Sequence, residues 1–294
     1  MTDKRVRALV LTGYGINSEQ EMAHGYKLAG ARVTVAHLSD ILEGDLALED
    51  FHILNFPGGF SFGDHLPAGR ALADKLKVTK GFWSRLSRFV EDKRFIWGIG
   101  NGFQVMVKLG LLPMVEGRVG EPEVFVEANP SGQFEDRWVR LAVNADSPCV
   151  YTRGLTELTL PCRTAEGRIV LGDDVRQRVL ANGYVPLQFA DAHGEATQQH
   201  PDNPTGSEAG IAGLCDETGR IFGLMPHPEA HLFFNNHPNW TAKKVRLFQQ
   251  GVRTLPVEGE GMLLFHNVVR QACEDFGLSI SAETEARTVQ AAAR

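Results

Sequence analysis

Short apolar runs recur through the first hundred residues, and most of them stop at a glycine-rich stretch. They occupy residues 6–11, 32–37, 51–56 and 95–99. Apolar runs of this length, bounded by turn residues, are typical of strands buried on both faces. The segments between them have helical patterns, so four β-α steps follow one another. The pattern predicts an α/β fold with a mostly parallel, doubly wound central sheet flanked by helices.

Two of the helical segments show identifiable ends. Ser18 and Glu21 have the spacing of a capping box, and Gly30 would end the helix that follows them. Residues 66–92 carry a second amphipathic pattern, which is predicted to form two helices that meet near Gly81. These helices would cover the faces of the parallel sheet.

The pattern changes after about residue 119, where shorter strand candidates alternate with polar and glycine-rich turns, as in a smaller antiparallel portion. The candidates are residues 139–143, 157–161, 185–189, 211–216 and 220–225. Two helical patterns follow within residues 241–277. We expect one domain over residues 1–278, with residues 241–278 as a C-terminal helical extension and residues 279–294 as a loose tail.

Composition narrows the classes of partner. The 294 residues carry a formal net charge of −6, which gives no electrostatic reason to expect nucleic acid or an anionic membrane as a partner. No apolar run reaches the roughly 18 residues that span a bilayer, and the N-terminus is no apolar signal segment, so a cytoplasmic location is predicted. The four cysteines are far apart, which favours reduced, buried thiols over a disulfide framework or zinc site.

The stretch from Phe95 to Gly110 has the form of a nucleophile elbow. A buried strand leads into Gly98-Ile-Gly-Asn-Gly102, and a short helix is predicted from Phe103 to Leu109. In such an elbow the central residue has a strained backbone, and the flanking glycines let strand and helix approach closely. The central residue here is Gly100, which has no side chain to act as a nucleophile.

A candidate base and orienting acid follow a later strand. His227 and Glu229 are two residues apart, so on an extended segment they would point the same way, and the carboxylate could orient the imidazole. A surface loop is the alternative interpretation of this triplet. His231 has the spacing of a second metal ligand, but Pro228 argues against a regular helix and no third ligand is apparent, so no metal ion is predicted.

Two loops offer backbone amides for a developing negative charge. Gly58 and Gly59 follow a buried strand, where such a pair is often only a turn but can also form part of an oxyanion hole. The amide of Asn101, directly after the central elbow residue, would be the second donor. Gln104, in the first turn of the elbow helix, would face the same cleft.

Several motifs together carry a family resemblance. Residues 98–104 resemble the G-x-C-N-G-x-Q elbow of class I, triad-type glutamine amidotransferases, and residues 227–229 resemble that class's H-x-E. Three further motifs narrow the match to the glutaminase subunits of phosphoribosylformylglycinamidine synthase, in purine biosynthesis. They are residues 57–64 (P-G-G-F-S-F-G-D), residues 15–21 (G-I-N-S-E-Q-E), and residues 203–207 with 225–229 (N-P-T-G-S and M-P-H-P-E).

The resemblance implies a Rossmann-like (flavodoxin-like) fold and a glutaminase reaction without a cofactor. In the family a thiolate attacks the side-chain amide of glutamine, ammonia leaves for a synthetase subunit, and water hydrolyses the thioester. Carried over, His227 is the base, Glu229 the orienting acid, and Gln104 a glutamine contact. The amides of Gly58, Gly59 and Asn101 are the oxyanion donors. The implied partners are glutamine, the synthetase subunit and its small accessory subunit.

The sequence departs from this family at two positions. Gly100 occupies the place of the nucleophilic cysteine, and Thr164 that of the histidine in an H-G-E-G-[KR] loop. Glycine keeps the elbow's shape but removes thioester chemistry, so we expect the glutaminase reaction to be lost or severely impaired. Either Gly100 is natural and the chain is a structural or regulatory subunit, or it was introduced into an active enzyme. Alanine or serine would be the commoner designed substitution, which favours the natural origin.

A dinucleotide-binding module is the rival from another class. Residues 13–18 and 98–103 both begin G-x-G, but their sixth residues, Ser18 and Phe103, stand where the fingerprint needs a small residue for helix packing. A pure binding subunit without enzymatic ancestry would give no reason for His227 and Glu229 beside an elbow.

Overall fold

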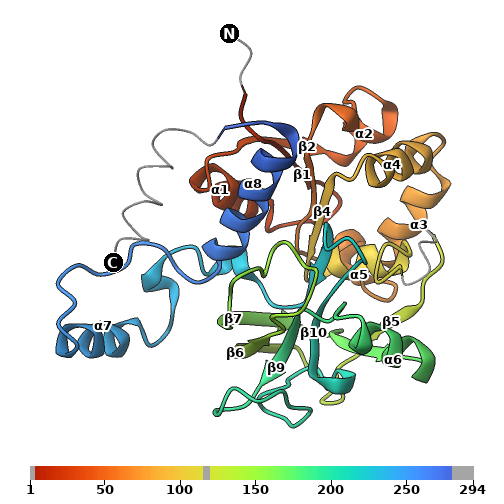
Figure 1. Ribbon diagram of the computed structural model, residues 1–294. Coiled ribbons are helices and arrows are strands. Elements are labelled where there is room, and N and C mark those ends of the chain that lie inside the picture. The colour runs from red at the N-terminus through yellow and green to blue at the C-terminus, as the bar shows by residue number, and fades with distance from the viewer. Residues whose placement is uncertain (1–3, 115–119, 280–294) are drawn as a thin grey trace.

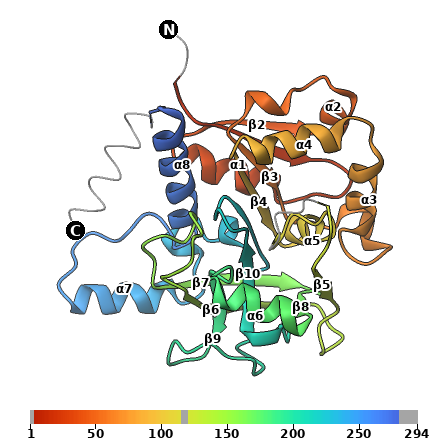
Figure 2. The same cartoon turned by 45° about the vertical axis from the view of Figure 1, so that its right-hand side comes forward.

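A nine-stranded mixed sheet forms the centre of the computed structural model, which describes residues 4–114 and 120–279 (Figures 1 and 2). The strands in spatial order are β2 (Arg32–His37), β1 (Arg7–Thr12), β3 (Ile53–Phe56), β4 (Phe95–Ile99), β11 (Ile221–Leu224), β10 (Ile211–Cys215), β9 (Leu187–Ala190), β6 (Glu135–Val143) and β7 (Glu157–Thr164). The first five pair in parallel, and each later pair is antiparallel. The predicted α/β class, with a mostly parallel sheet and an antiparallel portion, is confirmed.

Helices surround the parallel half and cover its two faces. They are α1 (Glu19–Leu28), α2 (Leu38–Glu43), α3 (Arg70–Val78), α4 (Phe82–Glu91), α5 (Asn101–Lys108) and α8 (Met262–Phe276). Two further helices, α6 (Asp173–Ala181) and α7 (Trp240–Gln249), lie away from it, and no residue of α7 is buried. Figure 1 shows α1 and α8 together on one side of β1 and β4, with α3, α4 and α5 on the other. The predicted break near Gly81 and the two C-terminal helices are confirmed.

Trp97 of β4 lies at the centre of the core that packs beneath α1 and α8. Its ring is fully buried, and its centroid lies 4.7 Å from that of Phe265, 5.1 Å from Tyr151 and 6.2 Å from Tyr26. Aromatic contacts of this kind contribute about 0.5–1.5 kcal/mol each beyond the burial of apolar area. They fix the strand that ends at Gly100.

On the opposite face, α5 packs so closely against the sheet that only glycine fits at two positions. A Cβ atom on Gly102 would lie 1.8 Å from the carbonyl oxygen of Phe56, and one on Gly98 would lie 2.4 Å from Sδ of Met106. The two glycines therefore allow strand, turn and helix to follow one another without a spacer, as the elbow pattern predicts.

Some elements differ from the sequence prediction. The third strand begins at Ile53 rather than Phe51, and the elbow helix begins at Asn101 rather than Phe103. The sequence pattern did not indicate α2, α6 or the two-stranded sheet of β5 (Val124–Glu127) and β8 (Arg168–Leu171). β5 and β8 pair with each other and not with the central sheet.

The predicted capping box at the start of α1 is wrong. Ser18 is the N-cap residue, but its side chain makes no cap hydrogen bond. Its hydroxyl instead faces Gly58, 3.0 Å from where a Cβ on that glycine would lie, and its backbone N–H donates to the Gly58 carbonyl over 3.3 Å. A tertiary contact with the Gly58 loop has thus taken the place of the local cap.

Two expectations from the sequence concern membrane-spanning segments and the C-terminal tail. Within the described residues, no helix is both long and apolar enough to cross a membrane. The predicted loose tail, residues 279–294, lies outside the described residues except for Ser279.

We predict that Gly102→Ala destabilises the protein by about 3 kcal/mol or more, because its Cβ would overlap the Phe56 carbonyl and force α5 from the sheet. Urea denaturation measures the change. Gly172→Ala is the matched control, since Gly172 has φ −65° and open space around its Cβ position. The control should stay within about 1 kcal/mol of wild type, and equal stability of the two variants would contradict the packing argument.

Candidate active site at the elbow

The carboxyl ends of β1, β3, β4 and β11 meet at one edge of the sheet, where ligands bind in open α/β folds. The first two glycine loops touch through an isolated bridge between Ile16 and Gly59. His227 lies between the loop after β3 and the elbow after β4, because Cβ positions on both Gly58 and Gly100 fall 2.8 Å from its Cε1. The three glycine-rich loops that follow β1, β3 and β4 therefore lie close together.

Gly100 has the strained backbone expected of an elbow. Its φ is 52° and its ψ is −112°, a conformation that costs other residues on the order of 1–3 kcal/mol. Its N–H donates to the Leu224 carbonyl over 2.9 Å, and its own carbonyl accepts from the N–H of Gln104 over 3.1 Å. These bonds join the elbow to β11 and start α5.

His227 and Glu229 form a buried pair. Nδ1 of the imidazole lies 2.6 Å from Oε1 of the carboxylate, and the His227 N–H donates to the Pro161 carbonyl over 2.7 Å. The segment is not extended as predicted, since Pro228–Ala230 form a 3-10 turn with His227 at its N-cap. Proline favours the first position of such a turn, and the tight turn brings the two side chains together.

The free edge of the imidazole faces Gly100. A Cβ on Gly100 would lie 2.8 Å from both Cε1 and Nε2 of His227, closer than carbon and nitrogen atoms normally approach. The ring is held by Glu229 on its other side. Any side chain at position 100 therefore requires His227 to shift by a few tenths of an ångström.

A cleft of about 530 Å³ opens beside this pair. Its lining includes the predicted residues Gly59, Asn101, Gln104, His227 and Glu229. Loops from both halves of the sheet also contribute Asn17, Ser18, Glu21, Phe60, Asp64, Ala68, Phe134, Arg163, Thr164, Ala165, Glu166 and Ala230. The structure thus brings the predicted site residues together.

The side chains of Asn101 and Gln104 link the elbow to the loop at residues 164–168. Asn101 Nδ2 donates to Oε1 of Gln104 over 2.9 Å, and Asn101 Oδ1 accepts from the Ser61 N–H over 3.1 Å. Nε2 of Gln104 donates to the carbonyl of Glu166 over 2.5 Å. Gln104 therefore positions the Glu166 loop at the cleft wall.

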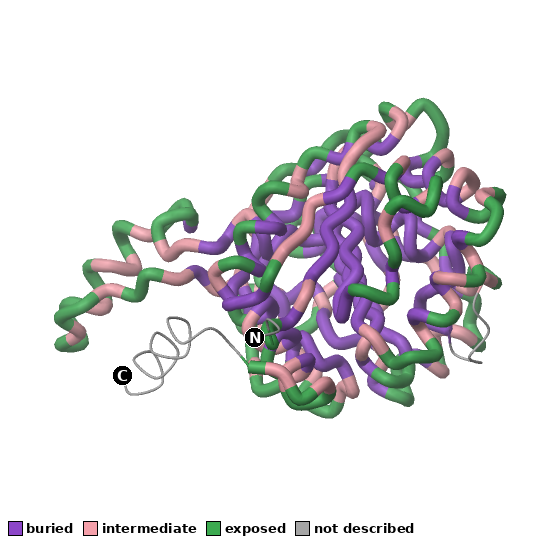
Figure 3. Tube along the Cα trace, turned by 90° about the horizontal axis from the view of Figure 1, so that it is seen from above, coloured by how far each residue is buried: buried purple, intermediate pink, exposed green. Residues whose placement is uncertain are grey.

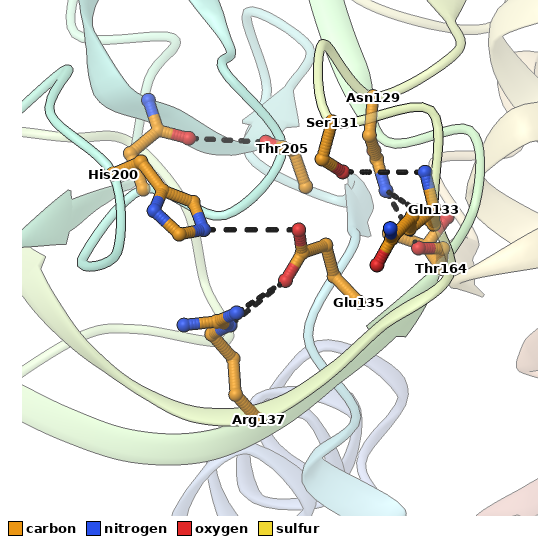
Figure 4. A network of polar contacts seen from close by, with 9 residues as sticks. Asn129, Ser131, Gln133, Glu135, Arg137, Thr164, His200 and Thr205 are labelled. Atoms are coloured by element: carbon orange, nitrogen blue, oxygen red, sulfur yellow. Dashed lines mark hydrogen bonds and ion pairs between the residues drawn. The ribbon is translucent and has the colours of Figure 1, made fainter.

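The same loop is held from behind by Asn129 and Ser207. Asn129 Nδ2 donates to the Thr164 carbonyl over 2.7 Å, a contact visible in Figure 4, and Asn129 Oδ1 accepts from the Gly167 N–H over 3.0 Å. Ser207 Oγ donates to the Gly167 carbonyl over 3.1 Å. The motif at residues 203–207 therefore buttresses a cleft loop.

The buried carboxylate of Glu135, the first residue of β6, lies between two basic side chains. Figure 4 shows Glu135 between Arg137, 2.5 Å away, and His200, 3.8 Å away. Burial acts to raise the pKa of Glu135, but bonds from Ser131 and Arg137 outweigh it and hold the pKa below its usual value. Glu135 therefore keeps its negative charge between Arg137 and His200 although it is buried.

Asp64 and Glu166 are cleft residues to which the sequence assigned no role. Burial first, and then the charge of Glu166, raise the pKa of Asp64 to about 6. Glu166 Oε2 accepts from the Ala68 N–H over 2.8 Å, and Asp64 Oδ1 accepts from Asn101 Nδ2 over 3.4 Å. Both lie in motifs noticed in the sequence, but only the fold places these distant carboxylates in one cleft.

His231 is directed away from the cleft. Its Nδ1 donates to the Thr159 carbonyl over 2.9 Å, and its ring lies edge-on to Trp138. Among the described residues, no group of three or more His, Cys, Asp and Glu has a geometry suited to a metal ion. The cysteines in that part of the chain are free, and three of the four are buried.

The fold and the cleft are those of a class I glutamine amidotransferase. A family model described as the CobB/CobQ-like glutamine amidotransferase domain matches residues 5–270, and the chain therefore belongs to this family.

Within the family the chain is similar to PurQ subunits of phosphoribosylformylglycinamidine synthase. It is 40% identical over 239 residues to that of Methanococcus maripaludis (strain C5), covering 81% of this chain and 88% of that protein. It is 37% identical over 270 residues to that of Dehalococcoides mccartyi (strain 195), covering 91% and 98%.

Solved structures agree with this assignment. The structure of PurLQS from Thermotoga maritima includes a chain 26% identical to this one, with a TM-score of 0.63 and coverage of 92% and 99%. A putative GMP synthase subunit from Thermoplasma acidophilum, 14% identical with a TM-score of 0.51, shares the fold.

We predict that Asp64→Asn stabilises the protein at pH 7 by about 1 kcal/mol, after allowance for solvent screening. Because the pKa of Asp64 is raised to about 6, the folded state keeps this proton to higher pH than the unfolded chain. The free energy of unfolding should therefore fall as pH rises from about 4 to about 6, and the variant should lose that dependence. Asparagine also tolerates the φ of 48°.

Urea denaturation across this pH range measures the effect, and Asp40→Asn, on the surface helix α2, is the control. A wild-type stability that rises through the same range, or an equal response of both variants, would contradict the assignment.

Proposed function

We propose that this chain is the glutaminase-type subunit of phosphoribosylformylglycinamidine synthase and binds glutamine in the elbow cleft, but does not hydrolyse it at an appreciable rate. Its similarity to PurQ subunits supports the first part. The second part of the proposal rests on Gly100, at the end of β4. This residue faces His227 and has no side chain that could act as a nucleophile.

The proposed roles follow the positions of the cleft residues. His227 Nε2 would accept the proton of a nucleophile at position 100, and Glu229 would hold the imidazole in the required tautomer. Within residues 4–114 and 120–279, the N–H groups of Gly59 and Asn101 donate to no other group. They are thus free to bind an oxyanion, with Gly58 shaping the loop and Gln104 in contact with the substrate.

We assign Gly100 to the place of the family's nucleophilic cysteine. Without a thiolate no thioester forms, and the remaining oxyanion donors and binding contacts leave the rate several orders of magnitude short. The strained backbone at this position is compatible with either history, a natural glycine or a replaced cysteine.

The proposed partners are the synthetase subunit and its small accessory subunit, in the cytoplasm. The relatives are named as synthase subunits, and the Thermotoga maritima structure is titled PurLQS. A purely structural or regulatory subunit is the second candidate, favoured by the same glycine at position 100. The residues at positions 18 and 103 give no support to a dinucleotide-binding module.

We predict that wild-type protein releases no ammonia from glutamine above background and that Gly100→Cys restores it, with a gain on the order of 10³-fold or more. In the variant, the thiol proton would pass to His227 and the thiolate would attack the amide carbon. The imidazolium would then protonate the amide nitrogen, which leaves as ammonia, and water would hydrolyse the thioester to glutamate and the free thiol. Ammonia release, with and without the synthetase subunit, is the measurement.

Gly100→Ala is the control, because it adds the same Cβ against His227 without a thiol. Wild-type turnover at ordinary family rates would refute the inactive site. If Gly100→Cys folds but stays inactive, the double variant with Thr164→His tests whether the second departure is responsible.

We also predict that wild-type protein binds glutamine weakly without consuming it. Gln104→Ala should weaken binding about tenfold, since it removes the link between Asn101 and the Glu166 loop. Gln177→Ala, at an exposed position of α6, should not. Calorimetry that detects no binding even with the synthetase subunit present would contradict this prediction.

A further inference from the structure

The segment between Phe233 and Glu258 leaves the body of the protein as an arm. Its two ends pair through a bridge between Phe233 and Glu258 and a hydrogen bond from the Phe234 N–H to the Val257 carbonyl, 3.0 Å long. Figure 3 shows a projection formed mainly by exposed and intermediate residues, and Figure 1 shows α7 inside it. No residue of α7 is buried, so the helix adds nothing to the core.

The arm is basic in an acidic protein. Between Phe233 and Glu258 the arm contains four cationic side chains and no aspartate or glutamate, so the rest of the chain carries −10 against −6 for the whole. Lys243 pairs with Glu260 at 3.0 Å. Within the described part of the chain, Lys244, Arg246 and Arg253 have no carboxylate partner.

Apolar side chains lie among these cations. Val245 is 53% exposed and Phe248 42% exposed. The ammonium of Lys244 lies 5.7 Å from the ring centroid of Phe248 and 6.0 Å from that of Trp240. Aromatic rings flanked by cations are typical of protein interfaces, where Trp, Phe and Arg are enriched.

A groove of about 430 Å³ lies at the root of the arm. Trp138 and His237 line it with the cations Arg140, Lys243 and Arg246. Arg140 lies 4.0 Å from Glu157 and Lys243 3.0 Å from Glu260, so Arg246 is the cation of the groove that has no carboxylate partner among the described residues. One of its two carboxylates, Asp191, already accepts the N–H groups of His193 and Glu195. Positive charge around an aromatic side chain suits a segment rich in carboxylates.

Glu260, just after the arm, joins the root of the arm to strand β7. Glu260 Oε1 pairs with Lys243, and its Oε2 accepts from the Thr159 N–H of β7 over 2.6 Å. The arm begins three residues after Ala230, which lines the elbow cleft. A protein held by the arm would therefore lie near that cleft.

We propose that the α7 arm and the groove at its root dock an acidic segment of a protein partner. This inference rests on the proposed function, in which the partner is the synthetase subunit that accepts ammonia. The pairing of exposed cations with apolar side chains favours a protein over nucleic acid, which the chain's net charge also disfavours. A single ten-residue helix is a weak membrane anchor, because stable anchoring usually takes two signals.

The test measures binding of the full-length chain to the purified synthetase subunit by interferometry at about 50 mM and about 500 mM salt. Lys244→Glu with Arg246→Glu should weaken binding at least tenfold at low salt and remove most of the salt dependence. Phe248→Ser should increase the dissociation rate. Neither variant touches a buried residue, and unchanged melting temperatures would verify folding.

Lys77→Glu with Lys80→Glu is the control, since it makes the same change of charge at two exposed residues, one in the last turn of α3 and one just after it. Unaltered binding by the arm variant, or equal weakening by the control, would overturn the docking surface while leaving the proposed function intact. No complex with wild-type protein would overturn both. Arm-dependent binding to anionic vesicles, RNA or a second copy, without arm-dependent binding to the synthetase, would also overturn the inference.

Discussion

The close approach of helix α5 to strands β3 and β4 is the constraint on which the rest of the structure depends. A Cβ on Gly102 would overlap the Phe56 carbonyl, and one on Gly98 would meet Met106. Because the helix must start directly at the end of β4, the connecting residue Gly100 takes a backbone conformation that side chains disfavour. Its N–H is bonded to the end of β11, which leads on to His227. The position of the imidazole thus follows from how tightly one helix packs on the sheet.

The antiparallel half of the sheet completes the cleft rather than forming a separate site. It supplies the loop at residues 164–168, which Gln104 holds from the elbow side and Asn129 from behind. The N–H of His227 donates to Pro161 of β7, so this half also fixes the imidazole's backbone. The nine strands form one sheet, and each half contributes one wall of the same cleft.

The site keeps its shape although position 100 has no side chain. The imidazole of His227 is hydrogen-bonded to the carboxylate of Glu229, and Asn101 bonds to Gln104, which in turn bonds to the Glu166 loop. Glycine at position 100 avoids the backbone strain that another residue would suffer there. None of these contacts requires a nucleophile. Fold stability and chemical competence are therefore separable here, because the groups that organise the cleft differ from the atom that would react in it.

The sequence by itself determined the α/β class, the parallel strands, the elbow and the pair His227 and Glu229. Each of these features depends on a short stretch of neighbouring residues with a clear hydrophobic pattern or a recognisable motif. Tertiary structure decided what depends on contacts between distant segments. Contacts with the Gly58 loop hold Ser18 away from a capping geometry, Pro228–Ala230 form a 3-10 turn, and β5 pairs with β8. Tertiary structure also brought Asp64 and Glu166 into one cleft from positions 102 residues apart. Local pattern fixes which way a side chain can point, and only packing fixes what it meets.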